Sequence, residues 1–191
     1  DERIRSGKTD PRQGFETCGM VEFAKSFYRL GRITGDPIYA DRCEDVMLNH
    51  FPCAQTPDLK GLHYLTASNQ PQLDHDGNHD YYNGKHQVFY SPWEYRCCRH
   101  NVAMGWPWYV KNMWQATSDD GLAAWLYGAS QVSAQVGESG TPVNVKEVSD
   151  YPFSGYIRLE VSPREDVAFP LYLRIPRWAT SFEILVNGKS V

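Results

Sequence analysis

The spacing of apolar residues changes once along this 191-residue chain, close to Asp119-Asp120-Gly121. Before this point apolar residues recur every three or four positions, as they do on the buried face of a helix. After it, short segments of alternating or β-branched composition are separated by turn residues, and Asn187-Gly188 is a typical hairpin turn. The pattern predicts an α+β, multidomain chain with a helical part at 1–118 and a β-sandwich at 119–191. Its strands are expected at 122–127, 131–136, 143–148, 155–161, 168–175 and 182–186.

Three helices are predicted in the first part. The strongest covers Thr17–Thr34, where apolar residues recur with helical spacing and Gly35 follows as a stop. Asp36 is a suitable N-cap for a second helix over Pro37–Asn49. The short connection predicts that these two helices form an antiparallel hairpin. A third helix is expected over Asn101–Thr117.

The segment 51–92 between the second and third helices has no periodicity. It is rich in Pro, Gly, Asn and Asp and holds four histidines, at 63, 75, 79 and 86. A loop of this length is uncommon in a compact domain unless it has a function. The His/Asp run at 74–80 fits no familiar ligand spacing, so we interpret it as a solvated active-site loop in preference to a second metal site.

The chain has five cysteines, at positions 18, 43, 53, 97 and 98. Five is a small and odd number, which argues against a disulfide-stabilised scaffold. Cys43 is expected in a helical core, and Cys53 receives no role. Adjacent side chains rarely share one face, so Cys97 and Cys98 are poorly placed to pack together in a hydrophobic core. The pair can, however, present two sulfurs to one ion. Soft thiolates select zinc, copper(I) or iron–sulfur centres.

Glu16 and Cys18, at the start of the first helix, would complete a shell of one carboxylate and three sulfurs. Four such ligands match tetrahedral zinc, and a helix N-terminus favours the thiolate. Spacing alone leaves this zinc site and a buried carboxylate with three packed thiols equally open.

Charge and hydropathy exclude several classes of protein. The net charge of -4 and the pI near 5.9 argue against a nucleic-acid partner and a polybasic membrane patch. No apolar run reaches the roughly 18 residues of a spanning helix. The absence of an initiating Met leads us to expect a piece of a longer protein. Aromatic residues make up 14% of the chain, which suits sugar stacking and an ordinary core equally well.

Three segments resemble glycoside hydrolase family 127, the bacterial β-L-arabinofuranosidase-like enzymes. They are residues 9–18 (TDPRQGFETC) with Glu22-Phe23 after them, residues 95–101 (YRCCRHN) and residues 171–178 (LYLRIPRW). The resemblance implies an (α/α)6 catalytic barrel followed by β-sandwich domains. It also implies a retaining hydrolase that uses a zinc-bound cysteine as nucleophile and a glutamate as general acid/base. Because a complete barrel needs about twelve helices, this chain is expected to hold only its C-terminal part.

Residue by residue, the resemblance assigns Cys97 as nucleophile and Glu2, upstream of Glu-Thr-Cys, as the acid/base. Glu22 is the competing carboxylate, but it lies beside Lys25 on a predicted helix face and is more simply a surface residue. A metal-bound thiol is deprotonated outright, which makes such a cysteine a competent nucleophile. The implied zinc ligands are Glu16, Cys18, Cys97 and Cys98.

The expected function is hydrolysis of L-arabinofuranosides or related sugars of plant glycans. The expected partner is a carbohydrate substrate, with no nucleic acid and no membrane; homo-oligomers and a bacterial periplasmic or cytoplasmic location stay open. A structural zinc protein and a carbohydrate-binding module without catalysis are the alternatives. A catalytic site would expose Cys97 beside Glu2, whereas a structural site would bury both.

Overall fold

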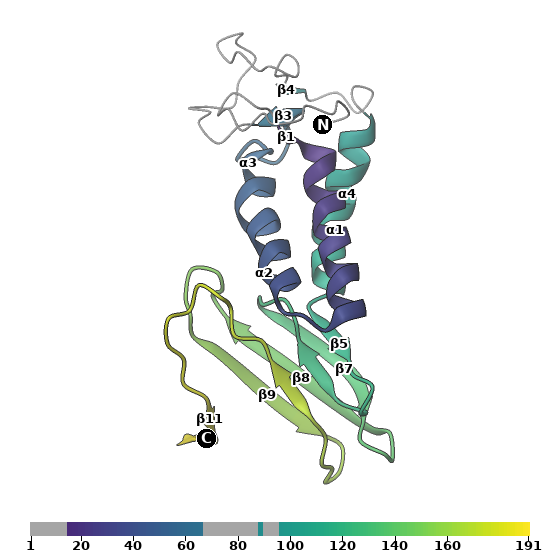
Figure 1. Ribbon diagram of the computed structural model, residues 1–191, viewed down its shortest axis with the longest axis vertical. Coiled ribbons are helices and arrows are strands. Elements are labelled where there is room, and N and C mark those ends of the chain that lie inside the picture. Colours follow the sequence, from purple (N-terminus) through teal and green to yellow (C-terminus); the bar gives the residue numbers. More distant parts are fainter. Residues whose placement is uncertain (1–14, 67–87, 90–95) are drawn as a thin grey trace.

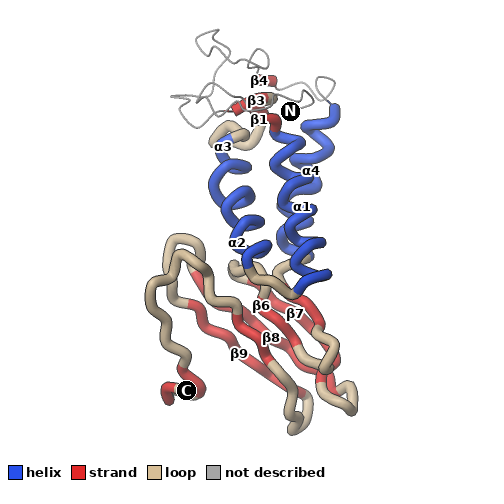
Figure 2. Tube along the Cα trace, in the orientation of Figure 1, coloured by secondary structure: helices blue, strands red, loops and turns tan. Residues whose placement is uncertain are grey.

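The computed structural model describes residues 15–66, 88–89 and 96–191. Three helices stand side by side at one end of the molecule, and two three-stranded sheets form the other end (Figures 1 and 2). The helices are α1 (Thr17–Thr34), α2 (Ile38–Asp45) and α4 (Arg96–Lys111); a π-helical turn, Val46–His50, and the short α3 (Phe51–Cys53) continue α2. This mixed α/β arrangement confirms the prediction of a helical part followed by a β part.

Helix α1 begins and ends at the predicted residues. Gly35 takes the left-handed conformation, with φ at 70°, and its N–H donates to the carbonyl of Gly31 at 2.7 Å. Asp36 then caps the next helix, because its carboxylate accepts the N–H of Ile38 at 2.9 Å. The two helices run antiparallel, as predicted (Figure 1).

The prediction for the third helix is wrong at both ends. Helix α4 begins at Arg96, and Trp114–Ala116 forms strand β5 instead of a last helical turn. The apolar spacing continues through Met113 and Trp114, so the sequence pattern conceals the boundary. What ends the helix is pairing: β5 lies antiparallel to β6 (Leu122–Ala124), and the carbonyl of Met113 accepts the N–H of Trp125.

Two sheets of three strands make up the β part. One has the order β10-β6-β5, with β10 (Leu171–Leu173) parallel to β6. The other has the order β7-β8-β9, all antiparallel, over Ser130–Val136, Thr141–Ser149 and Ile157–Pro163. A hairpin of β11 (Leu185–Val186) and β12 (Lys189–Ser190) follows. Asn187 and Gly188 both have positive φ there, at 51° and 79°, so the predicted hairpin turn is confirmed.

Four two-residue strands lie near the beginnings of α1 and α4. β1 (Phe15–Glu16) pairs with β3 (Leu65–Thr66), and β2 (Leu62–His63) pairs with β4 (Val88–Phe89). Thr17 strengthens this connection, because its hydroxyl donates to the carbonyl of His63 at 2.6 Å and its N–H to that of Tyr64 at 3.1 Å. The short pairs therefore fix the chain at the point where α1 begins.

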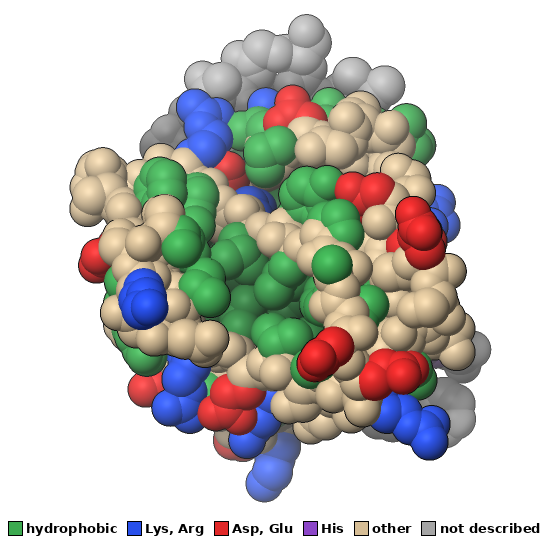
Figure 3. Space-filling view, turned by 90° about the horizontal axis from the view of Figure 1, so that it is seen from below, with side chains coloured by type: hydrophobic (Ala, Val, Ile, Leu, Met, Phe, Trp, Pro, Cys, Tyr) green, Lys and Arg blue, Asp and Glu red, His purple; other side chains and the backbone are tan. Residues whose placement is uncertain are grey.

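The helices and the sheets have adjoining apolar cores. In the helical core, Tyr28, Phe51 and Tyr109 pack between the three helices, and Trp125 and Leu126 close it from the sheet side. In the second core, Leu122 packs against Val136, Val143 and Val145 of the other sheet. Seen from below, the β part also presents apolar side chains around a hollow (Figure 3).

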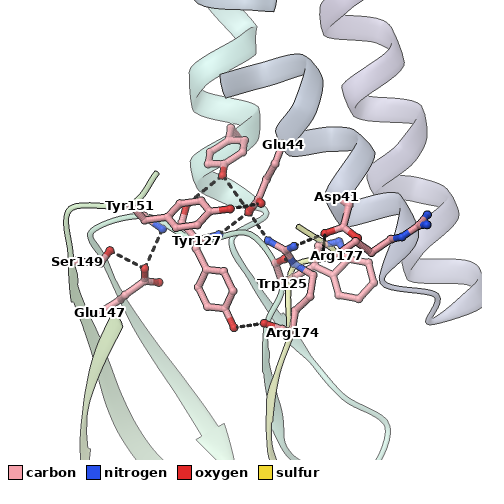
Figure 4. Close-up of polar contacts among 11 residues, drawn as sticks. Asp41, Glu44, Trp125, Tyr127, Glu147, Ser149, Tyr151, Arg174 and Arg177 are labelled. Carbon is pink, nitrogen blue, oxygen red and sulfur yellow. Dashed lines mark hydrogen bonds and ion pairs between the residues drawn. The ribbon is translucent and has the colours of Figure 1, made fainter. Parts of the chain in front are cut away.

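A buried polar network joins α2 to the β part (Figure 4). Arg174, which follows β10, pairs with Asp41 at 2.6 Å and with Glu44, and its Nε donates to the carbonyl of Trp125 at 2.7 Å. Glu44 also accepts the N–H of Tyr127 at 3.0 Å and the hydroxyl of Tyr151 at 2.5 Å. These contacts hold the helical part against the sheets. No helix in the described ranges is long and apolar enough to cross a membrane.

Candidate metal centre

The beginnings of α1 and α4 meet at one place, and the predicted metal ligands lie there. Cys18 is the second residue of α1, while Cys97 and Cys98 are the second and third residues of α4. The two helices run in the same direction, so both N-termini point to the same region (Figure 1). The positive dipole ends of the two helices favour negative charge at this point, which here means carboxylate and thiolate.

Four side chains converge into one cluster, whose ligand atoms all lie within 4.8 Å of one another. The sulfur of Cys18 lies 2.8 Å from Oε1 of Glu16 and 3.1 Å from the sulfur of Cys98. The sulfur of Cys98 lies 4.0 Å from that of Cys97 and 3.8 Å from Glu16 Oε1. All three cysteines are free thiols. The two motifs, which lie about 80 positions apart in the sequence, therefore bring their side chains together in the structure.

These distances fit a small tetrahedral ion. With Zn–S bonds of about 2.3 Å, the sulfurs of a tetrahedral site are separated by roughly 3.8 Å. The separations that Cys98 makes with Cys97 and with Glu16 are already close to that value. The separation between the sulfurs of Cys18 and Cys98 is shorter and would need to widen by about 0.7 Å, and that between Cys18 and Glu16 would also need to widen. Glu16, Cys18, Cys97 and Cys98 thus lie close enough to hold a metal ion.

The cluster is closed on one side and open on the other. Cys98 is completely buried, Glu16 is 6% exposed, and Cys98 packs with Leu62 in a small apolar cluster that includes Val102. Cys97, in contrast, is exposed. Of the four residues Cys97 is thus the most exposed, and Cys18 is half-buried.

The thiols need a positive partner to ionise here. Hydrogen bonding to Cys98, burial and the neighbouring Glu16 all raise the pKa of Cys18 far above that of a free thiol. Burial, followed by the proximity of Cys18, raises the pKa of Cys97, while its hydrogen bond with Cys98 lowers it. Three sulfurs and a carboxylate this close repel one another as anions, and a bound divalent cation reverses that effect. The donor set is chemically suited to a metal.

Comparison with known proteins identifies the family. The model of the β-L-arabinofuranosidase GH127 catalytic domain matches residues 2–111, more than half of the chain, and the GH127 middle-domain model matches residues 121–191. The chain belongs to glycoside hydrolase family 127. No curated protein sequence matches it.

Two solved GH127 structures are similar to this family member. One is Ara127N-Se, a GH127 β-L-arabinofuranosidase from Geobacillus stearothermophilus T6, with a TM-score of 0.75 and 26% identity over 95% of this chain. The other is the GH127 β-arabinofuranosidase BT3674, with a TM-score of 0.69 and 22% identity over 92% of this chain. The chain spans 28% of the length of each of these proteins.

Of the other residues singled out from the sequence, some lie outside the described ranges and the rest can be located in the structure. Glu2 and the His/Asp run at 74–80 lie outside the described residues. Glu22 is exposed on α1 and lies 3.4 Å from Lys25, as expected of a surface residue. Cys43 is 3% exposed in the helical core, as predicted, and Cys53 is exposed and outside the cluster.

The network of Glu44 and Arg174 was not predicted from the sequence. Its one signal is an arginine inside an otherwise apolar strand segment, Leu171-Tyr172-Leu173-Arg174-Ile175, where a buried position would ordinarily be apolar. Arg174 is 6% exposed, and such burial requires charged partners. Nothing in the sequence indicates that those partners lie 130 or more positions away.

Proposed function

We propose that this chain supplies the nucleophile and the zinc site of a retaining glycoside hydrolase that acts on L-arabinofuranosides or related plant-glycan sugars. The observation that carries the proposal is the exposure of Cys97 beside the buried Glu16 and Cys98 and the half-buried Cys18, a set that could hold a metal ion. Membership of GH127 supports it, as do the arabinofuranosidase activities named for the two similar structures. A purely structural zinc site would use the same four ligands, but it would not require an exposed cysteine that a substrate can reach.

Zinc is the cation that this set suits best, because three sulfurs and one carboxylate make a borderline-soft, four-coordinate site. Bound zinc would keep the cysteines as thiolates at neutral pH. Glu16, Cys18 and Cys98 would act as fixed ligands, since the apolar contacts of Leu62 and Val102 hold Cys98 in place. Cys97 would be the ligand that also faces the substrate.

The reaction would have two steps. The Cys97 thiolate attacks the anomeric carbon, a C–S bond forms, the glycosidic C–O bond breaks, and the departing oxygen takes a proton from the acid. Water, deprotonated by the same group, then attacks that carbon and releases the Cys97 thiolate. Two inversions give net retention. We assign the acid/base role to Glu2, which would have to lie about as near Cys97 as paired carboxyl groups do in retaining enzymes, roughly 5 Å.

We further propose the domain division made from the sequence. Residues 1–118 would form part of an (α/α)6 barrel, with α1, α2 and α4 as three of its helices. Residues 119–191 would form a β-sandwich. The core shared by the two three-stranded sheets supports the second assignment.

Metal analysis and covalent labelling test the proposal. The purified protein should contain about one zinc per chain, and Cys18→Ser should lose most of it, whereas Cys53→Ser should keep it. A mechanism-based arabinofuranoside inactivator, followed by peptide mapping, should label Cys97. Label on a carboxylate instead of Cys97 would refute the thiolate mechanism.

The role of Glu2 needs a separate test in the full-length protein. Glu2→Gln should slow hydrolysis of natural glycosides far more than that of aryl glycosides, whose activated leaving groups need no proton. Equal losses on both kinds of substrate would show that another residue is the acid.

A further inference from the structure

A cavity of about 650 Å³ lies where α2 meets two loops of the β part. Its walls come from α2 and the π-helical turn on one side, and from the loops that follow β8 and β10 on the other. The volume is within the range of small-molecule sites, which commonly occur where two structural units meet. None of the four metal-cluster residues lines it.

An aromatic pair forms one wall of the cavity. The rings of Tyr151 and Trp178 are stacked, with centroids 6.3 Å apart and an angle of 26° between their planes. Tyr151 is held in place because its hydroxyl donates to Glu44 Oε2 at 2.5 Å (Figure 4). Trp178 is 60% exposed, so one face of its indole remains available. A fixed, exposed indole offers the electron-rich surface against which the C–H groups of a sugar ring can pack.

The opposite wall is polar. Asp41, Asp45 and Asn49 follow one another at four-residue intervals, and all three line the cavity. Asp45 and Asn49 are exposed, and the side-chain amide of Asn49 donates to the carbonyl of Asp45, which leaves its own oxygen available. Carboxylate and amide groups at such spacing can accept and donate hydrogen bonds to several hydroxyls.

The charges around the cavity balance. Asp41, Glu44 and Asp45 contribute three negative charges, while the lining residues Arg42 and Arg177 and the adjacent Arg174 contribute three positive ones. Such a site has no net preference for an anion or a cation. Together with the aromatic wall, this favours a neutral ligand rich in hydroxyl groups.

We propose that this cavity, bounded by α2, Tyr151 and Trp178, binds a neutral sugar ring at a site separate from the metal centre. The metal cluster lies at the beginnings of α1 and α4, whereas the cavity lies beside α2 and the sheet loops. The cavity holds no exposed thiol, since the neighbouring Cys43 is buried in the helical core. A sugar bound there would lie apart from the thiols of the metal centre.

Titration of the full ¹⁵N-labelled chain with L-arabinose tests the proposal. The indole N–H signal of Trp178, assigned with Trp178→Phe, should shift saturably. Asn49→Ala and Asp45→Asn should each raise the Kd by about tenfold, the effect of losing one or two hydrogen bonds. Phe182→Ala is the matched control, because Phe182 is 66% exposed and does not line the cavity.

Cys97→Ser separates this site from the metal centre, and it should leave the Trp178 shift unchanged. The proposal is overturned if L-arabinose does not shift the indole N–H signal of Trp178. It is also overturned if that shift disappears in Cys97→Ser but persists in Asn49→Ala and Asp45→Asn. In that last case the sugar would bind only at the metal centre, which would leave the proposed hydrolase function intact.

Discussion

Replacing Arg174 with methionine should destabilise the protein strongly. The Arg174 side chain is 1% exposed and holds two carboxylates, Asp41 at 11% exposure and Glu44 at 6%. Methionine fills similar space but supplies no charge. Both carboxylates would then remain in a poorly solvated position without their cation, and the carbonyl of Trp125 would lose a donor.

Removing one partner of a buried ion pair costs about 3–5 kcal/mol. For a chain of this size, each kcal/mol corresponds to about 2–4 °C in Tm. Arg174→Met should therefore lower Tm by roughly 6–20 °C, and urea unfolding should show the same loss in the free energy of unfolding. The double variant Arg174→Met/Glu44→Gln should recover part of the loss, because a neutral amide at position 44 no longer needs the guanidinium.

The chain contains a matched control. Arg158 pairs with Glu160 at 2.8 Å, but these side chains are 56% and 45% exposed. Arg158→Met should change the free energy of unfolding by no more than about 1 kcal/mol, since exposed pairs are hydrated and screened. Equal effects at positions 158 and 174, or a double variant at 44 and 174 with simply additive losses, would refute the reasoning.

Three further predictions concern packing, alkaline pH and metal affinity. Gly31→Ala should lower the free energy of unfolding by about 1–3 kcal/mol in urea titrations, because the new Cβ would lie 2.4 Å from Cζ2 of the buried Trp125. Gly155→Ala is the control and should be nearly neutral, because a Cβ added there meets no heavy atom within 4 Å. Burial raises the pKa of Cys43 and of Tyr127 to about 12, above their ordinary values of 9.0 and 10.0. The folded state therefore keeps protons that the unfolded state releases. The two groups should contribute their full stabilisation below about pH 9, and the free energy of unfolding should fall as the pH rises through about 12. A constant value over that range in urea titrations would contradict this. Because the pKa values of Cys18 and Cys97 are raised, protons compete with the cation, and zinc affinity measured against a chelator should increase with pH; an affinity that does not change between about pH 6 and 8 would show that the thiols are not ligands.

Features that depend on neighbours in the sequence could be predicted. The ends of α1 follow from its apolar spacing and from Gly35, and the last hairpin turn follows from Asn187-Gly188. The paired Glu-Thr-Cys and Cys-Cys motifs, together with the resemblance to family 127, also singled out the four residues of the metal cluster, although spacing alone left packed thiols equally open. In each case the conformational preference is local to the residues concerned. The attraction of a helix N-terminus for a thiolate is also local, because it comes from the helix dipole and not from distant parts of the chain.

Tertiary structure alone decided the rest. The same apolar spacing serves the end of α4 and strand β5, and only pairing with β6 separates them. Arg174 meets Asp41 and Glu44 across more than 130 residues, and the wall of Tyr151 and Trp178 faces α2 only after the sheets dock. Periodicity reports which face of a segment is buried, but it carries no information about which distant segment covers that face. Buried charges and cavities are products of that docking, so they become visible only when the whole chain is packed.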